Sequence, residues 1–296
     1  MKRIFVLLFF SLLLVPMLCV GTSHAAQSNI TEAEGTACMG EDKTKKQTAE
    51  AAFADAKRRA VEYTLTYVKS ETQVKNFQLE KDLIEAYGNA SVRIIEEMEK
   101  KWYRDESMGD CFKIKIKAEV IPDEKGMDRI ANDRQTADDP SAPLNVRVWT
   151  DKKEYNNGEN IKVYLKGNKP FYARVIYKDA GGSMVQILPN LHRINNYFNG
   201  AVIYEIPGGE DKFELEVSPP FGNESIIVFG SSSQLGDVDL TPAGELYEIN
   251  TKSEDIGIKS RGVKIKGVEK DSGQKSEFEK KPAEFSETNA VVKTIK

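Results

Sequence analysis

Two helices are predicted near the start of the chain from the spacing of its apolar residues. Between Lys43 and Ser70, apolar positions recur at steps of three and four residues, which places them on one stripe of a helix. The stripe consists of Ala49, Ala52, Phe53, Ala56, Ala60, Tyr63 and Tyr67. A second helix is predicted from about Leu79 to Tyr87, and Gly88 after it is a typical stop.

Further along, the period of the apolar residues changes to two. Five apolar positions alternate with charged ones between residues 112 and 120, which predicts a half-buried strand. The segment 92–102 alternates less regularly and is separated from that strand by a turn cluster at 105–109. A long hairpin is therefore favoured, with a helix over 95–102 as the alternative. Residues 35–39 are expected to form a short strand, and residues 27–34 a loose start.

This order of elements predicts an α+β domain over residues 30–121, with two helices packed on one face of a small antiparallel sheet. Residues 122–143 are polar and contain proline, which is typical of a linker. From residue 144 to residue 296, short apolar segments are separated by turn signals such as Asn156-Asn157-Gly158. The second part of the chain is therefore expected to be an all-β, sandwich-like domain.

The first 25 residues have the pattern of a secretory signal peptide. Lys2 and Arg3 precede an apolar run, and small residues follow it up to Ala25. We predict cleavage after Ala25 and a periplasmic or secreted mature protein. A membrane anchor is the alternative, but Pro16 interrupts a run that is already short for a spanning helix. Lipidation at Cys19 is disfavoured because the residues before it are not small.

Charge argues against a nucleic-acid partner. Without Lys2 and Arg3, the 42 basic residues of the chain become 40 against 46 acidic ones, a net charge of −6. Phosphate binding is driven by clustered positive charge, which this balance does not favour. No later stretch is apolar for long enough to span a bilayer, so the mature chain is not expected to span a membrane.

The mature chain keeps two cysteines, Cys38 and Cys111. Because exported proteins meet an oxidising environment, the pair is expected to form a disulfide, with two separate thiols as the alternative. Cys111 has the same strand parity as the lysines that follow it. The bond is therefore predicted on the open face of the sheet, where it would tie the first strand of the domain to the last.

Several turn motifs in the second part resemble a known family. The motifs are Tyr155-x-x-Gly158-Glu159, Asp179-x-Gly181, Ile187-x-Pro189-Asn190 and Pro219-Pro220-Phe221-Gly222-x-Glu224. They resemble domain of unknown function family 4384, which occurs in bacterial envelope and other multidomain proteins. The resemblance implies a β-sandwich-like fold and no established catalytic residues.

The first part of the chain resembles the N-terminal domain of flagellar assembly protein T and related envelope lipoproteins. The residues that carry the resemblance are Gly35-x-x-Cys38, Ala56-x-x-x-Ala60, Glu85-Ala86-Tyr87 and the strand from Gly109 to Val120. It implies the fold and an association with the cell envelope. The lipidation box is missing and a different domain follows, so a flagellar role is not implied.

Two groups of side chains are candidates for a binding surface. Lys113, Lys115 and Lys117 form a basic stripe along one strand, which either is the solvated face of a sheet or meets an acidic partner or anionic lipid. The tyrosines in the second part are mostly expected to pack in the core or at sheet edges. Those chosen as surface candidates, able to stack on sugars or anchor a peptide, are Tyr164, Tyr172 and Tyr197.

The sequence offers little for catalysis. His192 is the only histidine after the signal peptide, and it lies in a segment typical of an exposed loop. A nucleophilic cysteine would need a free thiolate, which a disulfide removes. No phosphate-binding glycine loop and no metal-binding cysteine–histidine spacing is present, so neither a cofactor nor a metal is expected. A calcium site at Asp151, Glu154 and Asn157 is a disfavoured alternative.

The leading hypothesis is therefore a non-catalytic exported protein that binds another envelope component, most simply a protein, as an assembly or accessory factor. The alternative is a carbohydrate-binding module that holds cell-wall glycan through its outward tyrosines.

Overall fold

The structure is a computed structural model that describes residues 26–72, 77–132, 138–209, 211–244, 246–262, 267–268 and 279–296. The predicted signal peptide and its cleavage site lie outside the described residues. The sequence also predicts a strand-like segment at residues 262–265, and most of it likewise lies outside the described residues.

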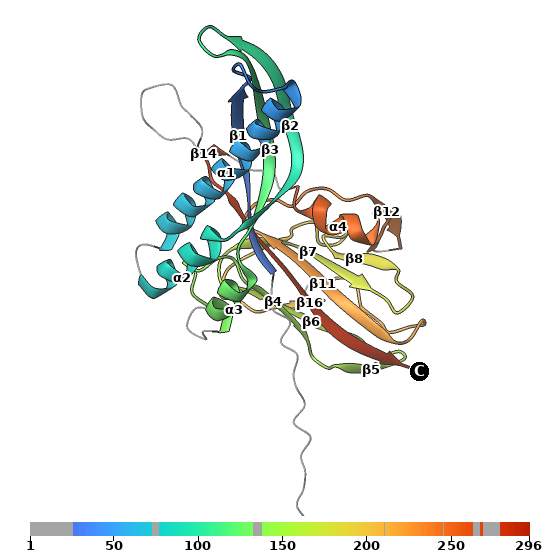
Figure 1. The fold of residues 1–296 in the computed structure, drawn as a ribbon. Coiled ribbons are helices and arrows are strands. Elements are labelled where there is room, and N and C mark those ends of the chain that lie inside the picture. The colour runs from blue at the N-terminus through green and yellow to red at the C-terminus, as the bar shows by residue number, and fades with distance from the viewer. Residues whose placement is uncertain are drawn as a thin grey trace, which may run out of the picture.

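The first half of the chain contains the two predicted helices and the predicted hairpin (Figure 1). Its elements are β1 (Ala26–Cys38), α1 (Lys45–Thr72), α2 (Phe77–Gly88), β2 (Ser91–Asp105) and β3 (Gly109–Ile121). The stripe of α1 is buried at Ala52, Ala56 and Ala60. Both helices contribute to a core with the apolar side chains of β3, so the prediction of helices on a small antiparallel sheet is confirmed in outline.

The expectation of a loose start before residue 35 is wrong, because β1 begins at Ala26. The segment reads as irregular since it is polar, yet Ser28, Asn29 and Thr31 are buried. Two of these buried polar groups have partners inside the protein: the Ser28 hydroxyl donates to Glu119, and Asn29 accepts from the hydroxyl of Tyr87. Buried polar groups are tolerated in a strand when they are hydrogen-bonded in this way.

The second half consists mainly of short strands, in agreement with its predicted β character. They are β4 (Val146–Thr150), β5 (Glu154–Asn156), β6 (Val163–Gly167), β7 (Phe171–Lys178), β8 (Met184–Leu188), β9 (Tyr197–Phe198), β10 (Tyr204–Ile206), β11 (Asn223–Ser231), β12 (Leu240–Ala243), β13 (Leu246–Ile249), β14 (Gly267–Val268), β15 (Glu279–Lys280) and β16 (Ala283–Ile295). A small sheet, β10-β6-β4, shares a hydrophobic core with β7, β8, β11 and β16 of the large sheet. This is the two-layered packing expected of a sandwich.

One sheet runs through both halves. Its order is β12-β13-β8-β7-β11-β16-β1-β3-β2, because β1 pairs with β3 on one side and its first residues pair with β16 on the other (Figure 1). The last strand of the chain therefore joins the first strand. The division into two separately folded domains is not tested by this arrangement and stays a prediction.

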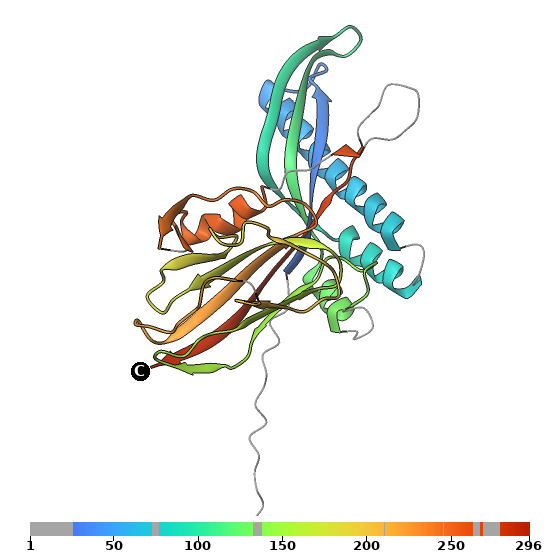
Figure 2. The same cartoon turned by 180° about the vertical axis from the view of Figure 1, so that it is seen from behind.

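Two helices were not predicted. α3 (Glu124–Asn132) lies in the segment assigned to a polar linker, and its Met127 and Ile130 are buried against the core of the first half. α4 (Ser253–Ser260) covers the other face of the large sheet, where Ile256 packs with Ile176 and Phe229 (Figure 2). Each is between two and three turns long, too short for a clear period in the sequence. Every helix in the described part of the chain is too short or too polar to cross a bilayer.

Candidate functional site

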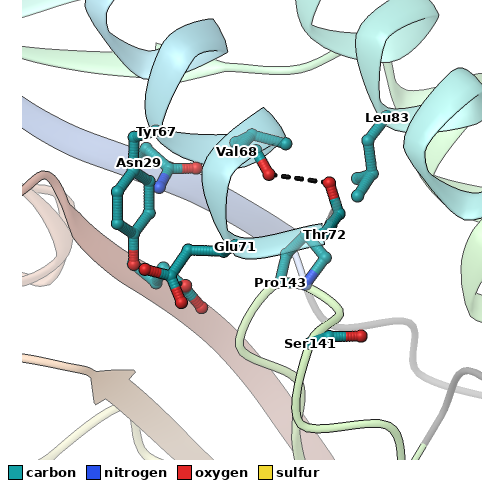
Figure 3. A pocket seen from close by; sticks show the side chains of 9 residues that line it. Asn29, Tyr67, Val68, Glu71, Thr72, Leu83, Ser141 and Pro143 are labelled. Carbon is teal, nitrogen blue, oxygen red and sulfur yellow. Dashed lines mark hydrogen bonds between the residues drawn. The ribbon is translucent and has the colours of Figure 1, made fainter. Parts of the chain in front are cut away.

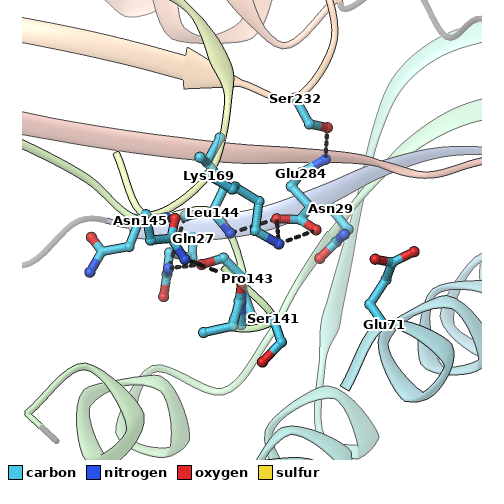
Figure 4. A network of polar contacts seen from close by, with 12 residues as sticks. Gln27, Asn29, Glu71, Ser141, Pro143, Leu144, Asn145, Lys169, Ser232 and Glu284 are labelled. Atoms are coloured by element: carbon cyan, nitrogen blue, oxygen red, sulfur yellow. Dashed lines mark hydrogen bonds and ion pairs between the residues drawn. The ribbon is translucent and has the colours of Figure 1, made fainter. Parts of the chain in front are cut away.

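A buried carboxylate lies where the two halves of the chain meet. Glu284 of β16 is 5% exposed and accepts the hydroxyl of Tyr67 on α1 at 3.0 Å and the backbone N–H of Leu144 at 2.6 Å. The ammonium of Lys169, from the turn between β6 and β7, lies 2.9 Å away (Figure 4). The backbone N–H of Glu284 donates to the hydroxyl of Ser232. One side chain thus connects a helix of the first half to three segments of the second.

Neighbouring side chains extend this junction. The amide of Gln27 on β1 donates to the carbonyl of Leu144 at 2.9 Å (Figure 4). Burial, and next the charge of Glu284, raise the pKa of the Tyr67 phenol far above its usual value. Burial likewise raises the pKa of Tyr87. Both phenols therefore stay protonated and act as donors, which is the role that a carboxylate and an amide oxygen require of them.

A small cavity adjoins the junction, between α1, α2 and the segment 141–143 (Figure 3). Its volume is about 10 Å³, enough for roughly one water molecule. The Asn29 amide lines it, and the nitrogen of that amide has no partner among the described residues. The cavity suits a bridging water and is far too small for a substrate or cofactor.

A second buried carboxylate organises the opposite face of the sheet. Glu119 on β3 is 1% exposed and accepts from Arg261 at 2.6 Å and from Ser28 at 2.7 Å. Arg261, directly after α4, also contacts Glu287 and lies over the ring of Phe285. Burial lowers the pKa of Arg261, but the two glutamates raise it by more, so the guanidinium stays charged. The cluster fixes α4 to the sheet.

A larger hollow, of about 450 Å³, lies beside α4. Its floor includes Ile176, Ile227 and Phe229, and its rim includes Arg93 and Arg261. Both arginines contact Glu119, so the hollow offers an apolar floor but no strong unpaired cation for an anionic group.

The disulfide predicted between Cys38 and Cys111 is present. The two residues lie opposite each other in β1 and β3, with their Cα atoms 3.9 Å apart. The pairing of β1 with β3 continues without a register shift, so Cys111 shares the face of the lysines that follow it, as predicted. That face is not open at this position, however, because Cys111 is fully buried.

The three lysines of the basic stripe are ion-paired along their length. Lys113 lies 2.6 Å from Glu34 and Lys115 lies 3.0 Å from Glu32, both on β1. Lys117 lies 3.3 Å from a carboxylate of β2. The stripe is thus one column of a mixed-charge face. An acidic partner would have to compete with these glutamates.

Tyr164 of β6 faces outward, and the structure gives it a partner that the sequence analysis overlooked. It lies opposite Trp149 of β4, and their rings are nearly parallel, with centroids 5.7 Å apart and planes 17° apart. Trp149 is 37% exposed. In the sequence, Val146 and Val148 alternate with Arg147 and Trp149. The two-residue period of a strand therefore puts Trp149 on the outer face, and this signal could have identified it.

Tyr172 and Tyr197 also meet, on another surface. They lie opposite each other in β7 and β9, with ring centroids 5.1 Å apart in an edge-to-face arrangement. Tyr197 is largely exposed, and Tyr172 is half-buried. The predicted tyrosines therefore form two separate aromatic pairs. They do not form one continuous surface.

Comparison with known proteins finds a family match for part of the second half of the chain. Residues 154–234 match the family described as domain of unknown function (DUF4384). The match supports the resemblance seen in the turn motifs of the second half. No curated protein and no solved structure matches the chain. The resemblance of residues 30–121 to flagellar assembly protein T is not shown by these comparisons and stays a prediction.

The DUF4384 match covers only part of the candidate surfaces. It includes the aromatic pair Tyr172–Tyr197 and Lys169 of the junction. It includes Tyr164 but not its partner Trp149, and it ends well before Glu284 of β16. The strand that joins the two halves is thus outside the matched residues.

The histidine considered for catalysis and the residues considered for calcium binding lie in the second half of the chain. His192 is an exposed loop residue whose backbone N–H donates to the side chain of Asn190. Asp151, the first residue of the disfavoured calcium site, accepts from the hydroxyl of Tyr155 and the N–H of Lys162. Among the described residues, no group of three or more histidine, cysteine or acidic side chains is placed to hold a metal ion.

Proposed function

We propose that this protein is a non-catalytic, exported envelope protein that docks another envelope protein through the outer arm of its first half. We define the outer arm as the β2–β3 hairpin from Glu96 to Lys115. The signal-peptide pattern and the resemblance of both halves to envelope families support the location. The exposed apolar side chains of the arm support the docking role, and they are the observation that carries the proposal.

The arm projects away from the second half of the molecule (Figures 1 and 2). Four large apolar residues on it are exposed: Met98, Trp102, Tyr103 and Met108, the last of them 61% exposed at the turn. Tryptophan, tyrosine and methionine are enriched in protein interfaces, where a few large residues carry most of the binding energy. Trp102 also packs against Phe112 of β3, with ring centroids 4.9 Å apart, so the fold accounts for part of its position. A partner docked on this projecting hairpin would cover the apolar surface that stays exposed.

The edge of the arm supports the same proposal. β2 is the last strand on its side of the sheet, so one row of its backbone groups has no strand partner among the described residues. An exposed edge can pair with a strand of another protein. Register shifts after Ile94 and Glu97 interrupt this edge near its base, and bulges of this kind limit uncontrolled pairing. The regular part, from Glu99 to Asp105, carries the exposed aromatic residues.

Charge sets the expected character of the contact. Because the lysines of β3 are paired with glutamates, the arm has no long unpaired column of positive charge. Docking is therefore expected to depend on apolar contact and backbone pairing. Its affinity should vary little with salt, in contrast to contacts steered by charge.

Site-specific photocrosslinking in intact cells tests this proposal. A photoreactive residue replaces Met108 in one variant and Val291 of β16 in the control, because both side chains are 61% exposed and apolar. We expect one recurrent envelope protein to be crosslinked from position 108 and not from position 291. Adding Trp102→Ala to the first variant should strongly reduce that product. Identical products from both positions, or none from position 108, would refute docking through the arm.

A further inference from the structure

The small sheet β10-β6-β4 has an outer face with an aromatic centre. Trp149, Tyr164 and Glu205 lie side by side across its three strands in the pairing register. The two rings are nearly parallel, and their partly exposed edges and outer surfaces form an apolar strip. Cross-strand aromatic pairs stabilise sheets, so the pair alone does not imply a ligand.

Polar groups surround this pair on both sides. Lys162 lies 2.6 Å from Glu205 on one side. On the other, Asp138 accepts from Arg147 and, at 2.9 Å, from Lys166. These pairs are exposed to solvent: half of the Asp138 side chain is accessible. The aromatic strip is thus bordered by hydrogen-bond donors and acceptors that remain within reach of a ligand.

The balance of charge on this face narrows the class of ligand. Each carboxylate in these pairs has a cation beside it. The pairs contain three cations, Arg147, Lys162 and Lys166, and two carboxylates, Asp138 and Glu205. Such a face creates no strong field for a polyanion or a polycation. It does combine an apolar strip of two stacked rings with alternating donors and acceptors, and a pyranose ring offers the complement: apolar C–H groups on its faces and hydroxyls around its rim.

We propose that this face binds a β-linked, gluco-configured oligosaccharide. In such a chain the hydroxyls are equatorial, so the C–H groups of each sugar lie against Trp149 and Tyr164 while the hydroxyls point sideways. Glu205 and Asp138 accept hydrogen bonds from these hydroxyls, and Lys162 and Lys166 donate to them. The site is separate from the outer arm, so sugar binding at this face and protein docking at the arm can be tested independently.

The two tryptophans of the chain allow a direct test. In a Trp102→Phe variant, Trp149 is the only tryptophan, so its fluorescence reports on this face alone. The purified variant is titrated with the tetrasaccharides of β-1,4-linked N-acetylglucosamine and of β-1,4-linked glucose. We expect a saturable change in Trp149 emission with at least one of them, and weaker binding of the monosaccharides.

A pair of matched variants completes the experiment. Tyr164→Ala should weaken binding about tenfold, the usual size of one aromatic contact. Tyr197→Ala removes a tyrosine from the other aromatic pair, one that is more exposed than Tyr164, and should leave binding unchanged. Circular dichroism checks that each variant is folded. Emission that stays flat up to millimolar oligosaccharide, or equal affinity in the Tyr164→Ala variant, would overturn the proposal.

Discussion

The helix–sheet contact of the first half and the core of the second half are built from side chains of different size. In the first half, α1 lies on the sheet through Ala52, Ala56 and Ala60, and it approaches β1 closely at Gly35. In the second half, Phe171 and Phe198 stack with their centroids 5.3 Å apart at the centre of a larger cluster. Alanine and glycine permit close contact but bury little apolar area, whereas each aromatic ring buries a large one.

The first half, whose helix packs through small residues, also contains covalent and ionic links between its elements. The disulfide crosses β1 and β3 in the first half, and Asp55 of α1 connects that helix to the backbone of Thr36. The first half also shares β1 with the large sheet through its pairing with β16. The close contact of α1 with the sheet is thus supported by links outside the core, while the stacked rings of the second half contribute a large buried apolar area.

Each half carries one tryptophan, so their stabilities can be followed separately. Trp102 lies on β2 and Trp149 on β4. Variants that keep only one of them, Trp149→Phe or Trp102→Phe, report urea unfolding of the first or the second half by fluorescence.

The largest expected effect is the loss of the disulfide. The bond closes a loop of 73 residues. In the chain-entropy model its removal costs about 4 kcal/mol of unfolding free energy. In the Cys38→Ser/Cys111→Ser double variant we expect the Trp102 transition to move to lower urea by more than the Trp149 transition. Equal shifts of the two probes would mean that the halves unfold as one unit and share the benefit of the bond.

The next largest effect is expected at the junction. Glu284→Gln removes the charge that faces Lys169, whose side chain is only 13% exposed. Leaving one partner of a buried ion pair uncompensated costs about 3 kcal/mol. Because Glu284 contacts both halves, both tryptophan probes should shift together. The control is Glu154→Gln, which breaks the exposed pair with Lys293 and should change the unfolding free energy by less than about 0.5 kcal/mol.

A smaller effect should follow from filling the close contact of α1 with β1. A Cβ added at Gly35 would overlap the carbonyl of Ala52 and lie 2.8 Å from the Cα of Ala56. Gly35→Ala therefore forces the helix away from the strand, at a cost of about 2 kcal/mol. Gly88→Ala is the control, since nothing lies near a Cβ at that position. If both variants unfold like the wild type, the helix is not held as closely as the structure indicates.

Periodicity in the sequence was enough for the long regular elements. The three- and four-residue spacing of the alanines identified α1, and the alternation after Phe112 identified β3 and its outward lysines. The disulfide followed from cysteine count and compartment. These features are local, or depend on the mere presence of two residues, so one sequence suffices to predict them.

Features that depend on distant partners were missed. Residues 26–34 look irregular because the groups that satisfy Ser28 and Asn29 come from β3 and α2. The role of Glu284 depends on Tyr67 and Lys169, more than 100 residues away in the chain. The partnership of Trp149 with Tyr164 needs the pairing register of β4 with β6. No pattern within one segment contains that information.

The smallest expected effect concerns the tie between α1 and β1 and its dependence on pH. Asp55 accepts the N–H of Thr36 at 3.1 Å and contacts Arg58 and Arg59. Burial raises the pKa of Asp55, but these donors lower it by more, so its pKa is below the usual value in the folded protein. A carboxyl whose pKa is lowered in the folded protein stabilises the fold at pH values above its unfolded-state pKa of about 4. This stabilisation is lost as the pH falls through the folded-state pKa.

Asp55→Asn should therefore cost about 1 kcal/mol or less at pH 7, since solvent screens the pair. The difference from the wild type should be smaller at pH 3, because lowering the pH moves the wild-type carboxyl toward its protonated form. Urea unfolding of both proteins at the two pH values, read by Trp102, measures this. A difference that is equally large at both pH values would show that Asp55 acts through the shape of its side chain. In that case the charge of Asp55 would not contribute to holding α1 against β1.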